Sequence, residues 1–145
     1  MNKFDDTQLY HLLISNDLSA IDKFLNKFGL DSVDRDQRTF LMSAIVEKKI
    51  DIVKHLLDIG ADVNIHEKIG LTALHFAALE NNLEIIKLLI ESGAEIDAID
   101  NQGNTPLWRA IMTTDGDSDI SKYLVSKGAD LDQKNKHGVS PRDLL

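Results

Sequence analysis

The chain has 145 residues, a 43% hydrophobic content and a formal net charge of −8, and it contains no cysteine. Its length is that of one domain, and without cysteine it forms no disulfide and offers neither a thiol nucleophile nor a thiolate metal site. No apolar run approaches the roughly 20 residues of a membrane-spanning helix, and residues 1–17 lack the basic start and apolar core of a secretion signal. We therefore expect a cytoplasmic protein that does not enter a membrane.

The first part of the chain, residues 1–33, is a divergent copy of a pattern that becomes regular further on. Thr7 lies 32 positions before Thr39, and the apolar residues of 21–25 have the spacing of a second helix. The end unit of a stack needs one polar outer face, which the acids, lysines and Gln8 of this segment supply. We predict an N-terminal capping repeat.

Two landmarks recur along the rest of the chain. One is a T-x-L-x-x-A segment, whose threonines are 33 residues apart, and the other is Gly-Ala-Asp or Gly-Ala-Glu, spaced by 33 and then 35 residues. The two extra residues lie in the polar stretch 113–118, which is typical of a loop. Self-similarity at this period indicates stacked supersecondary units. The landmarks begin at Thr39, Thr72 and Thr105, and at Gly60, Gly93 and Gly128.

Each regular unit predicts two helices. The threonine suits an N-cap, and Pro106 stands where proline is best tolerated, at the first helical position. In the central copy the first helix has a face of small residues, and the second, from Leu83, is apolar around so much of its circumference that we expect it to be covered on several sides. Gly93 ends the second helix, and an extended run into a polar turn follows.

These patterns divide the chain into five units within one domain. Residues 100–134 form a repeat with a two-residue insertion, and residues 135–145 supply one turn and one short helix as a C-terminal half-repeat cap. We expect about four helix pairs and a final helix. The predicted units are 1–33, 34–66, 67–99, 100–134 and 135–145.

The repeated unit resembles an ankyrin repeat over essentially the whole chain. The resemblance implies an all-α ankyrin-repeat solenoid of stacked helix-turn-helix units with extended β-turn loops, and a binding role. At the family's Thr-Pro-Leu-His position, His75 is similar to a structural histidine that ties adjacent turns together. Gln37 departs from the pattern, because the family has glycine there, and this puts a standard turn in doubt. The resemblance is carried by Asp34, Glu67, Asp100 and Asn135 before the turns, by Gly70, Gly103 and Gly138 within them, and by Gly-Ala-Asp-Val-Asn at 60–64.

The sequence offers little to catalysis. Residues 115–119 have the alternating acids of a calcium loop, but Ile120 occupies the position that needs glycine and Ser126 the position that needs a bidentate glutamate, so a solvated loop is the better interpretation. The five histidines show no pair at metal-ligand spacing, and no phosphate loop or Gly-x-Ser-x-Gly elbow is present. We expect no enzyme activity, no metal and no cofactor.

Negative charge is concentrated in the central unit, where residues 67–100 hold seven acids against two lysines. Such a belt repels nucleic acid and would steer a basic protein partner. An acidic surface that only keeps the protein soluble remains an alternative.

In ankyrin-like stacks the turn tips and the exposed side of the first helix line a groove where partners dock. We expect Ile69, Leu71, Leu79, Ile99 and Met112 to form its apolar centre, although single exposed apolar side chains are commonplace. Trp108 is either a binding anchor or part of the packing between repeats. By position, the groove would comprise Arg35, Asp36, Arg38, Val46, Glu47, His66, Lys68, Ile69, Leu71, Leu79, Glu80, Ile99, Asn101, Gln102, Asn104, Met112, Thr113, Lys136, His137 and Val139.

The function expected from the resemblance is that of a non-enzymatic protein-protein interaction module, monomeric when free. The sharpest hypothesis is an acidic inhibitor or immunity protein that masks a basic toxin or enzyme. A scaffold or adaptor, and a regulatory or stabilising subunit of an enzyme, are the alternatives, and a hydrolytic activity of its own is the weakest of them.

Overall fold

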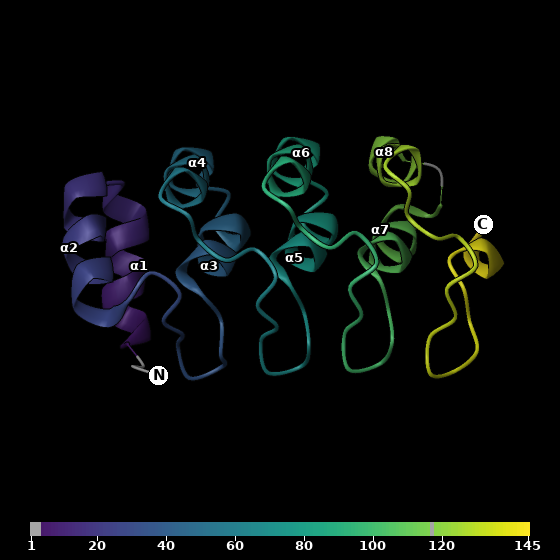
Figure 1. Cartoon of the computed structure of the whole chain (residues 1–145), viewed down its shortest axis with the longest axis horizontal. Helices are drawn as coiled ribbons and strands as arrows, with labels where there is room; N and C mark the ends of the chain where they lie inside the picture. Colours follow the sequence, from purple (N-terminus) through teal and green to yellow (C-terminus); the bar gives the residue numbers. More distant parts are fainter. Residues whose placement is uncertain (1–3, 117) are drawn as a thin grey trace.

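Helices stack in pairs from one end of the molecule to the other in the computed structural model, which describes residues 4–116 and 118–145 (Figure 1). A 3-10 turn, η1 (Arg142–Leu144), follows the last pair. Among the described residues no strand forms beyond one isolated bridge, between Val33 and Thr39. The expected all-α solenoid of four helix pairs and a final helix is confirmed. The pairs are α1 (Asp6–Ser15) with α2 (Leu18–Phe28), α3 (Phe40–Val46) with α4 (Ile50–Asp58), α5 (Ala73–Leu79) with α6 (Leu83–Glu91), and α7 (Pro106–Thr114) with α8 (Asp119–Ser126).

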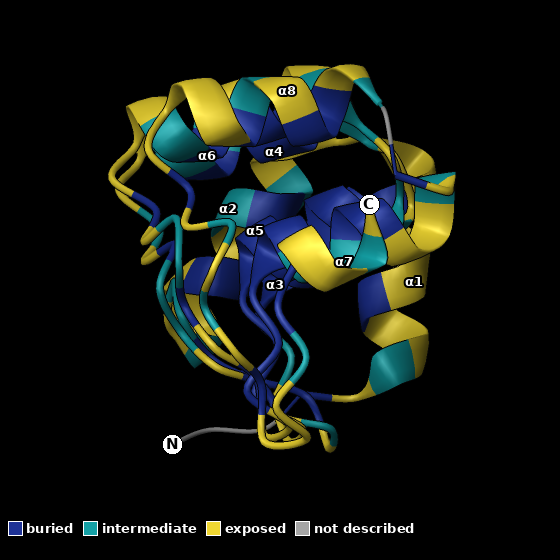
Figure 2. Ribbon diagram, turned by 90° about the vertical axis from the view of Figure 1, so that its right-hand side faces the viewer, coloured by how far each residue is buried: buried dark blue, intermediate teal, exposed yellow. Residues whose placement is uncertain are grey.

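Three layers are visible when the stack is viewed along its length (Figure 2). The top layer holds α4, α6 and α8, which are the second helices of their pairs. The middle layer holds the first helices, α3, α5 and α7, and the turns project below them. Two of the threonines cap as predicted: Thr39 Oγ1 accepts from the Met42 N–H at 3.2 Å, and Thr105 Oγ1 from the Trp108 N–H at 3.2 Å.

The first helices, and not the second, are the most enclosed elements. In α5 every residue of 73–78 is buried, and its alanines let the neighbouring helices approach closely. In α6, Ile85, Ile86 and Leu89 are buried, but Leu88 and Ile90 are only partly so and the charged residues face solvent. The expectation that this helix is covered on several sides is confirmed, because α6 packs on α5 and is flanked by α4 and α8, and only its outer, charged side faces solvent.

The turns are joined to one another by backbone hydrogen bonds. Lys68 N–H donates to the Asp36 carbonyl at 3.1 Å, and Lys136 N–H to the Gln102 carbonyl at 2.9 Å. Between them Asn101 N–H donates to the Ile69 carbonyl at 3.0 Å. The tips therefore form one continuous row in fixed register.

Gln37 adopts the conformation that glycine takes in the other turns. Its φ is +63°, against +88° for Gly70, and its N–H donates to the Asp34 carbonyl at 3.1 Å as the Gly70 N–H does to Glu67 at 2.9 Å. A standard turn therefore forms without glycine, at a cost of about 1 kcal/mol for a left-handed L-residue.

The first pair, α1 and α2, is inclined steeply to the others, which appear end-on in Figure 1. It attaches through aromatic rings: the centroid of Phe24 lies 5.1 Å from that of Phe4, 4.7 Å from that of Phe28 and 5.7 Å from that of Phe40. This inclination leaves a hollow of about 120 Å³ beside α1 and α3.

Gly70→Ala should lower the free energy of unfolding more than Gly138→Ala. Both positions have a positive φ, which alone costs alanine about 1 kcal/mol. A Cβ at Gly70 would also lie 2.6 Å from the backbone nitrogen of Asn101, whereas one at Gly138 meets nothing within 4 Å. We expect an additional loss of about 1–2 kcal/mol for Gly70→Ala, measured by urea unfolding. Equal losses would show that the turns can separate freely.

Candidate functional site

Each turn is held by a side-chain oxygen that stands directly before it. Asp100 Oδ1 accepts from the backbone N–H of Gln102 at 2.9 Å and of Asn104 at 3.0 Å. Glu67 Oε1 accepts from the backbone N–H of Ile69 at 2.8 Å and of Leu71 at 2.9 Å. Asp34 and Asn135 accept in the same way from the residues two and four positions after them. All four residues are buried, so these three carboxylates and one amide shape the turns and are not part of the surface.

Arg109, on α7, adds an ion pair to the Asp100 carboxylate. Its Nε donates to Oδ2 at 3.0 Å and its terminal nitrogen to the same oxygen at 2.5 Å. Burial would raise the pKa of Asp100, but the hydrogen bonds from Arg109 and from the backbone of Asn104 and Gln102 hold that pKa below its usual value. Asp100 is therefore ionised and fully engaged.

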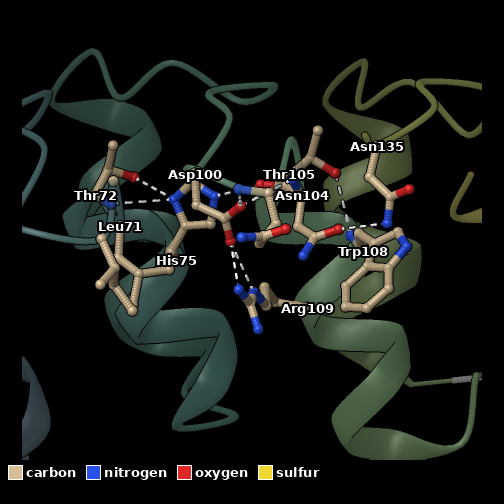
Figure 3. A network of polar contacts seen from close by, with 12 residues as sticks. Leu71, Thr72, His75, Asp100, Asn104, Thr105, Trp108, Arg109 and Asn135 are labelled. Carbon is tan, nitrogen blue, oxygen red and sulfur yellow. Dashed lines mark hydrogen bonds and ion pairs between the residues drawn. The ribbon is translucent and has the colours of Figure 1, made fainter. Parts of the chain in front are cut away.

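His75 ties two successive turns together, as the resemblance implied (Figure 3). Its Nε2 donates to the Asn104 carbonyl at 2.8 Å, and its Nδ1 accepts from the Thr72 N–H at 3.1 Å. Burial lowers the pKa of His75 to about 4, against smaller opposing contributions from Asn104 and Asp100. The imidazole is therefore neutral near pH 7, with its proton on Nε2.

Trp108 occupies the position of His75 in the next unit and does not continue this tie. Its side chain is half-buried, and its Nε1 is enclosed without a hydrogen-bond partner among the described residues. Asn135 Nδ2 instead donates to Asn104 Oδ1 at 2.8 Å (Figure 3). The Trp108 indole is thus enclosed at its nitrogen while another part of the side chain reaches the surface.

Most of the predicted groove residues lie at or near the surface. Two do not: Leu71 is 6% exposed and Asn104 is 5% exposed. Their side chains turn inward because the second arm of each turn runs back to the helix layer, where Leu71 joins the core and Asn104 bonds to Asn135. Exposed are Arg35, Glu47, His66, Lys68, Ile69, Ile99, Asn101, Gln102, Met112, Thr113, Lys136 and His137, and half-buried are Asp36, Arg38, Val46, Leu79, Glu80 and Val139.

One apolar row runs along the first helices at equivalent positions. Val46, Leu79 and Met112 each lie seven residues after the threonine that precedes their helix. Ile14, which is exposed, occupies the corresponding sequence position on α1, seven residues after Thr7. The prediction omitted Ile14, although the 32-residue displacement from Thr7 to Thr39 also leads from Ile14 to Val46.

Tyr10 is a second exposed residue that the prediction omitted. It lines the hollow beside α1 and α3 together with Arg38 and Glu47. The guanidinium of Arg38 lies 5.2 Å from the ring centroid of Phe76. No repeat-based signal pointed to this hollow, because it arises from the inclination of the first helix pair.

The exposed acids of the central unit lie away from the turn tips. Glu84 and Glu91 are on α6, in the second-helix layer, and Glu95 is in the loop that follows it. Glu84 forms an ion pair with Lys54 at 3.5 Å. With Glu67 buried as well, the acidic belt of the sequence does not cover the face formed by the tips.

Within the described residues no group of three or more histidine, aspartate or glutamate side chains is placed to hold a metal ion. In the calcium-like segment Asp117 lies outside the described residues, Asp115 ends α7, and Ser118 caps α8 by accepting from the Ser121 N–H at 3.1 Å. No helix in residues 4–116 or 118–145 combines the length and apolarity that crossing a bilayer requires.

An apolar hollow of about 360 Å³ lies at the far end of the stack. Leu107, Ile111, Val125 and Leu145 are among the residues that line it. Its lining comes from α7, α8, the connection between them and the C-terminal segment, and it includes no residue of the turn tips.

Comparison with known proteins relates this architecture to one family. A family model for ankyrin repeats in three copies matches residues 47–135. The chain is 28% identical over 135 residues to the Fowlpox virus ankyrin repeat protein FPV222, covering 92% of this chain and 18% of that protein. It is 50% identical over 131 residues to protein phosphatase 1 regulatory subunit 27 of Mus musculus and of Homo sapiens, covering 89% of this chain and 62% of each relative. The chain thus spans less than two thirds of the length of these relatives.

Protonation of His75 should weaken the fold in mild acid. Its folded pKa of about 4 lies below the usual 6.5, so the unfolded chain binds the extra proton first, and stability falls as the pH drops below 6.5. We expect the advantage in unfolding free energy of the native chain over His75→Gln to shrink by about 2 kcal/mol from pH 7 to pH 5. A constant advantage, by chemical denaturation at both pH values, would contradict a neutral His75.

Proposed function

The chain belongs to the ankyrin-repeat family, and we propose that it is a regulatory subunit that binds an enzyme through the face formed by its turn tips and first helices. Ankyrin repeats make it a protein-protein interaction module. The proposal adds the kind of partner and the surface that the partner contacts.

The exposed apolar residues of this face carry the proposal. Ile69 is 55% exposed, Ile99 47% and Met112 52%. Buried residues are their near neighbours in the sequence, so the fold buries apolar side chains there but leaves these three in solvent. With Val46 and Leu79 they continue across neighbouring units, and grouped apolar side chains indicate an interface more strongly than single ones.

The relatives favour the regulatory alternative among those considered. One of them is named a regulatory subunit of protein phosphatase 1, and it shares half of its aligned residues with this chain. The immunity-protein hypothesis receives no support from them. A scaffold would use the same face, but it would leave the activity of the bound enzyme unchanged.

We also infer that the protein acts without chemistry of its own. The polar groups that most resemble a reaction centre, the buried His75 and Asp100 and the half-buried Arg109, each hold a turn through hydrogen bonds. Such groups rigidify a binding surface, because side chains on a pre-ordered backbone lose less entropy when a partner docks.

Protein phosphatase 1 is the first enzyme to test. Binding of the full chain to purified phosphatase, by biolayer interferometry, should weaken about tenfold in Met112→Asp and in Ile14→Asp, since each places a charge in an apolar contact. Ile59→Asp, at an exposed position in the loop after α4, is the matched control and should bind normally.

Phosphatase activity measured in the same samples separates regulation from scaffolding. A change in activity that saturates with the bound fraction supports a regulatory subunit, and binding with unchanged activity supports a scaffold. If Ile59→Asp abolished binding while Met112→Asp did not, the proposed face would be wrong.

A further inference from the structure

We propose that the turn tips form a cationic ridge that binds an acidic, extended segment of the partner, with carboxylates at the first, fourth and tenth residues of that segment and an apolar residue at the seventh. The cationic ridge is the row of first tip residues, Arg35, Lys68, Asn101 and Lys136. The inference rests on the proposed function, because it names the chemistry of the partner at the same face.

The ridge is ordered by the backbone. Each of its members directly follows the buried oxygen that closes its turn, and all four are exposed. The N–H groups of Lys68, Asn101 and Lys136 donate to the preceding tip at 3.1, 3.0 and 2.9 Å. The backbone positions that carry the three cations and Asn101 are therefore fixed before any partner arrives.

The turns bury their acids and expose their cations. The acids Asp34, Glu67 and Asp100 are buried beneath the tips, where backbone N–H groups bind them. At the tips themselves only Asp36 is acidic, and it is half-buried. The chain as a whole carries −8, so an acidic segment is attracted at the ridge and repelled elsewhere, which fixes where it docks.

Arg35 already has a partner that it can exchange. Its Nε lies 2.9 Å from Asp6 Oδ2, but its side chain is 81% exposed. A solvent-exposed pair of this kind contributes little to stability. A carboxylate of the partner can therefore replace Asp6 at small cost.

The spacing of the ridge matches an extended chain. Packed helices lie about 10 Å apart, so successive tips are separated by about that distance, and an extended segment advances about 3.3 Å per residue. Carboxylates at positions 1, 4 and 10 of the segment would face Arg35, Lys68 and Lys136. Position 7 would face Asn101, whose amide cannot neutralise a carboxylate, and the exposed Ile69 and Ile99 beside it favour an apolar residue there.

A nucleic acid fits these observations less well than a peptide. Single strands are held by grooves that combine several cations with exposed aromatic rings on which bases stack. The exposed apolar side chains of the described tips are isoleucines, and the net charge of −8 repels a polyanion.

A synthetic peptide tests the proposal. The probe is a fluorescein-labelled twelve-residue peptide with glutamate at positions 1, 4 and 10, leucine at position 7 and serine elsewhere, measured by fluorescence anisotropy on the full chain at low salt. It should bind at least about threefold tighter than a peptide of the same composition with adjacent glutamates. Lys68→Glu and Lys136→Glu should each weaken binding about fivefold or more.

Two further variants serve as controls. Lys23→Glu changes the net charge equally, from an exposed position on α2, and should leave affinity within about twofold of that of the unchanged chain. Asn101→Lys should tighten binding of a peptide that carries glutamate at position 7 also. Circular dichroism on every variant checks that the fold is retained.

The proposal is overturned if both peptides bind alike, if Lys23→Glu weakens binding as much as Lys68→Glu, or if a twelve-nucleotide oligothymidylate binds the ridge more tightly than the ordered peptide. Its failure is distinguishable from failure of the proposed function. If Lys68→Glu leaves peptide binding unchanged while Met112→Asp still weakens enzyme binding, only the ridge is refuted. If Lys68→Glu weakens peptide binding while Met112→Asp leaves enzyme binding unchanged, only the apolar face is refuted.

Discussion

The structure depends on one buried oxygen in each turn. Asp34, Glu67, Asp100 and Asn135 each accept two backbone N–H groups, two and four residues further on, and thereby fix the path of the tip. Glutamate, aspartate and asparagine all serve, so the requirement is for an acceptor oxygen and not for a charge. Once the tips have one shape, each can donate an N–H to its neighbour, and the row of turns becomes a continuous surface instead of four separate loops.

Burying carboxylates in this way also decides the electrostatics of the surface. A charge removed from water is tolerated only when hydrogen bonds or an opposite charge compensate it. Asp100 has both, from the backbone and from Arg109, while Glu67 relies on backbone donors. The anions are therefore held inside the turns while lysine and arginine remain outside, and a strongly acidic chain presents a face that is locally basic. Composition alone pointed the other way, because a count of charges does not tell which of them are engaged.

The repeat period, the N-cap threonines and the turn acids predicted the fold, because each unit is set by local interactions and contacts only its neighbours. What the sequence could not settle depended on contacts between units. Leu71 and Asn104 turn inward because the arm of the turn leads back to the core and to Asn135. Gln37 takes a left-handed conformation because hydrogen bonds to Asp34 close its turn and the Lys68 N–H binds the turn from the next unit. The position of Ile14 could be read from the repeat register. The inclination of the first helix pair could not, because aromatic rings attach this pair to the stack and no repeat pattern encodes their packing.

The same locality explains why the fold is easier to infer than the partner. A tip residue such as Lys68 contributes its backbone to the stack and its side chain only to solvent, so its identity is free of folding constraints. Neighbouring positions obey the same rule: Met112 and Ile69 can vary without disturbing Leu74 or Ile86 in the core. Residues released from the fold in this way carry no information about stability. Under the proposed function they answer to the partner instead, and the order of charges along the ridge is then the part of the sequence that describes it.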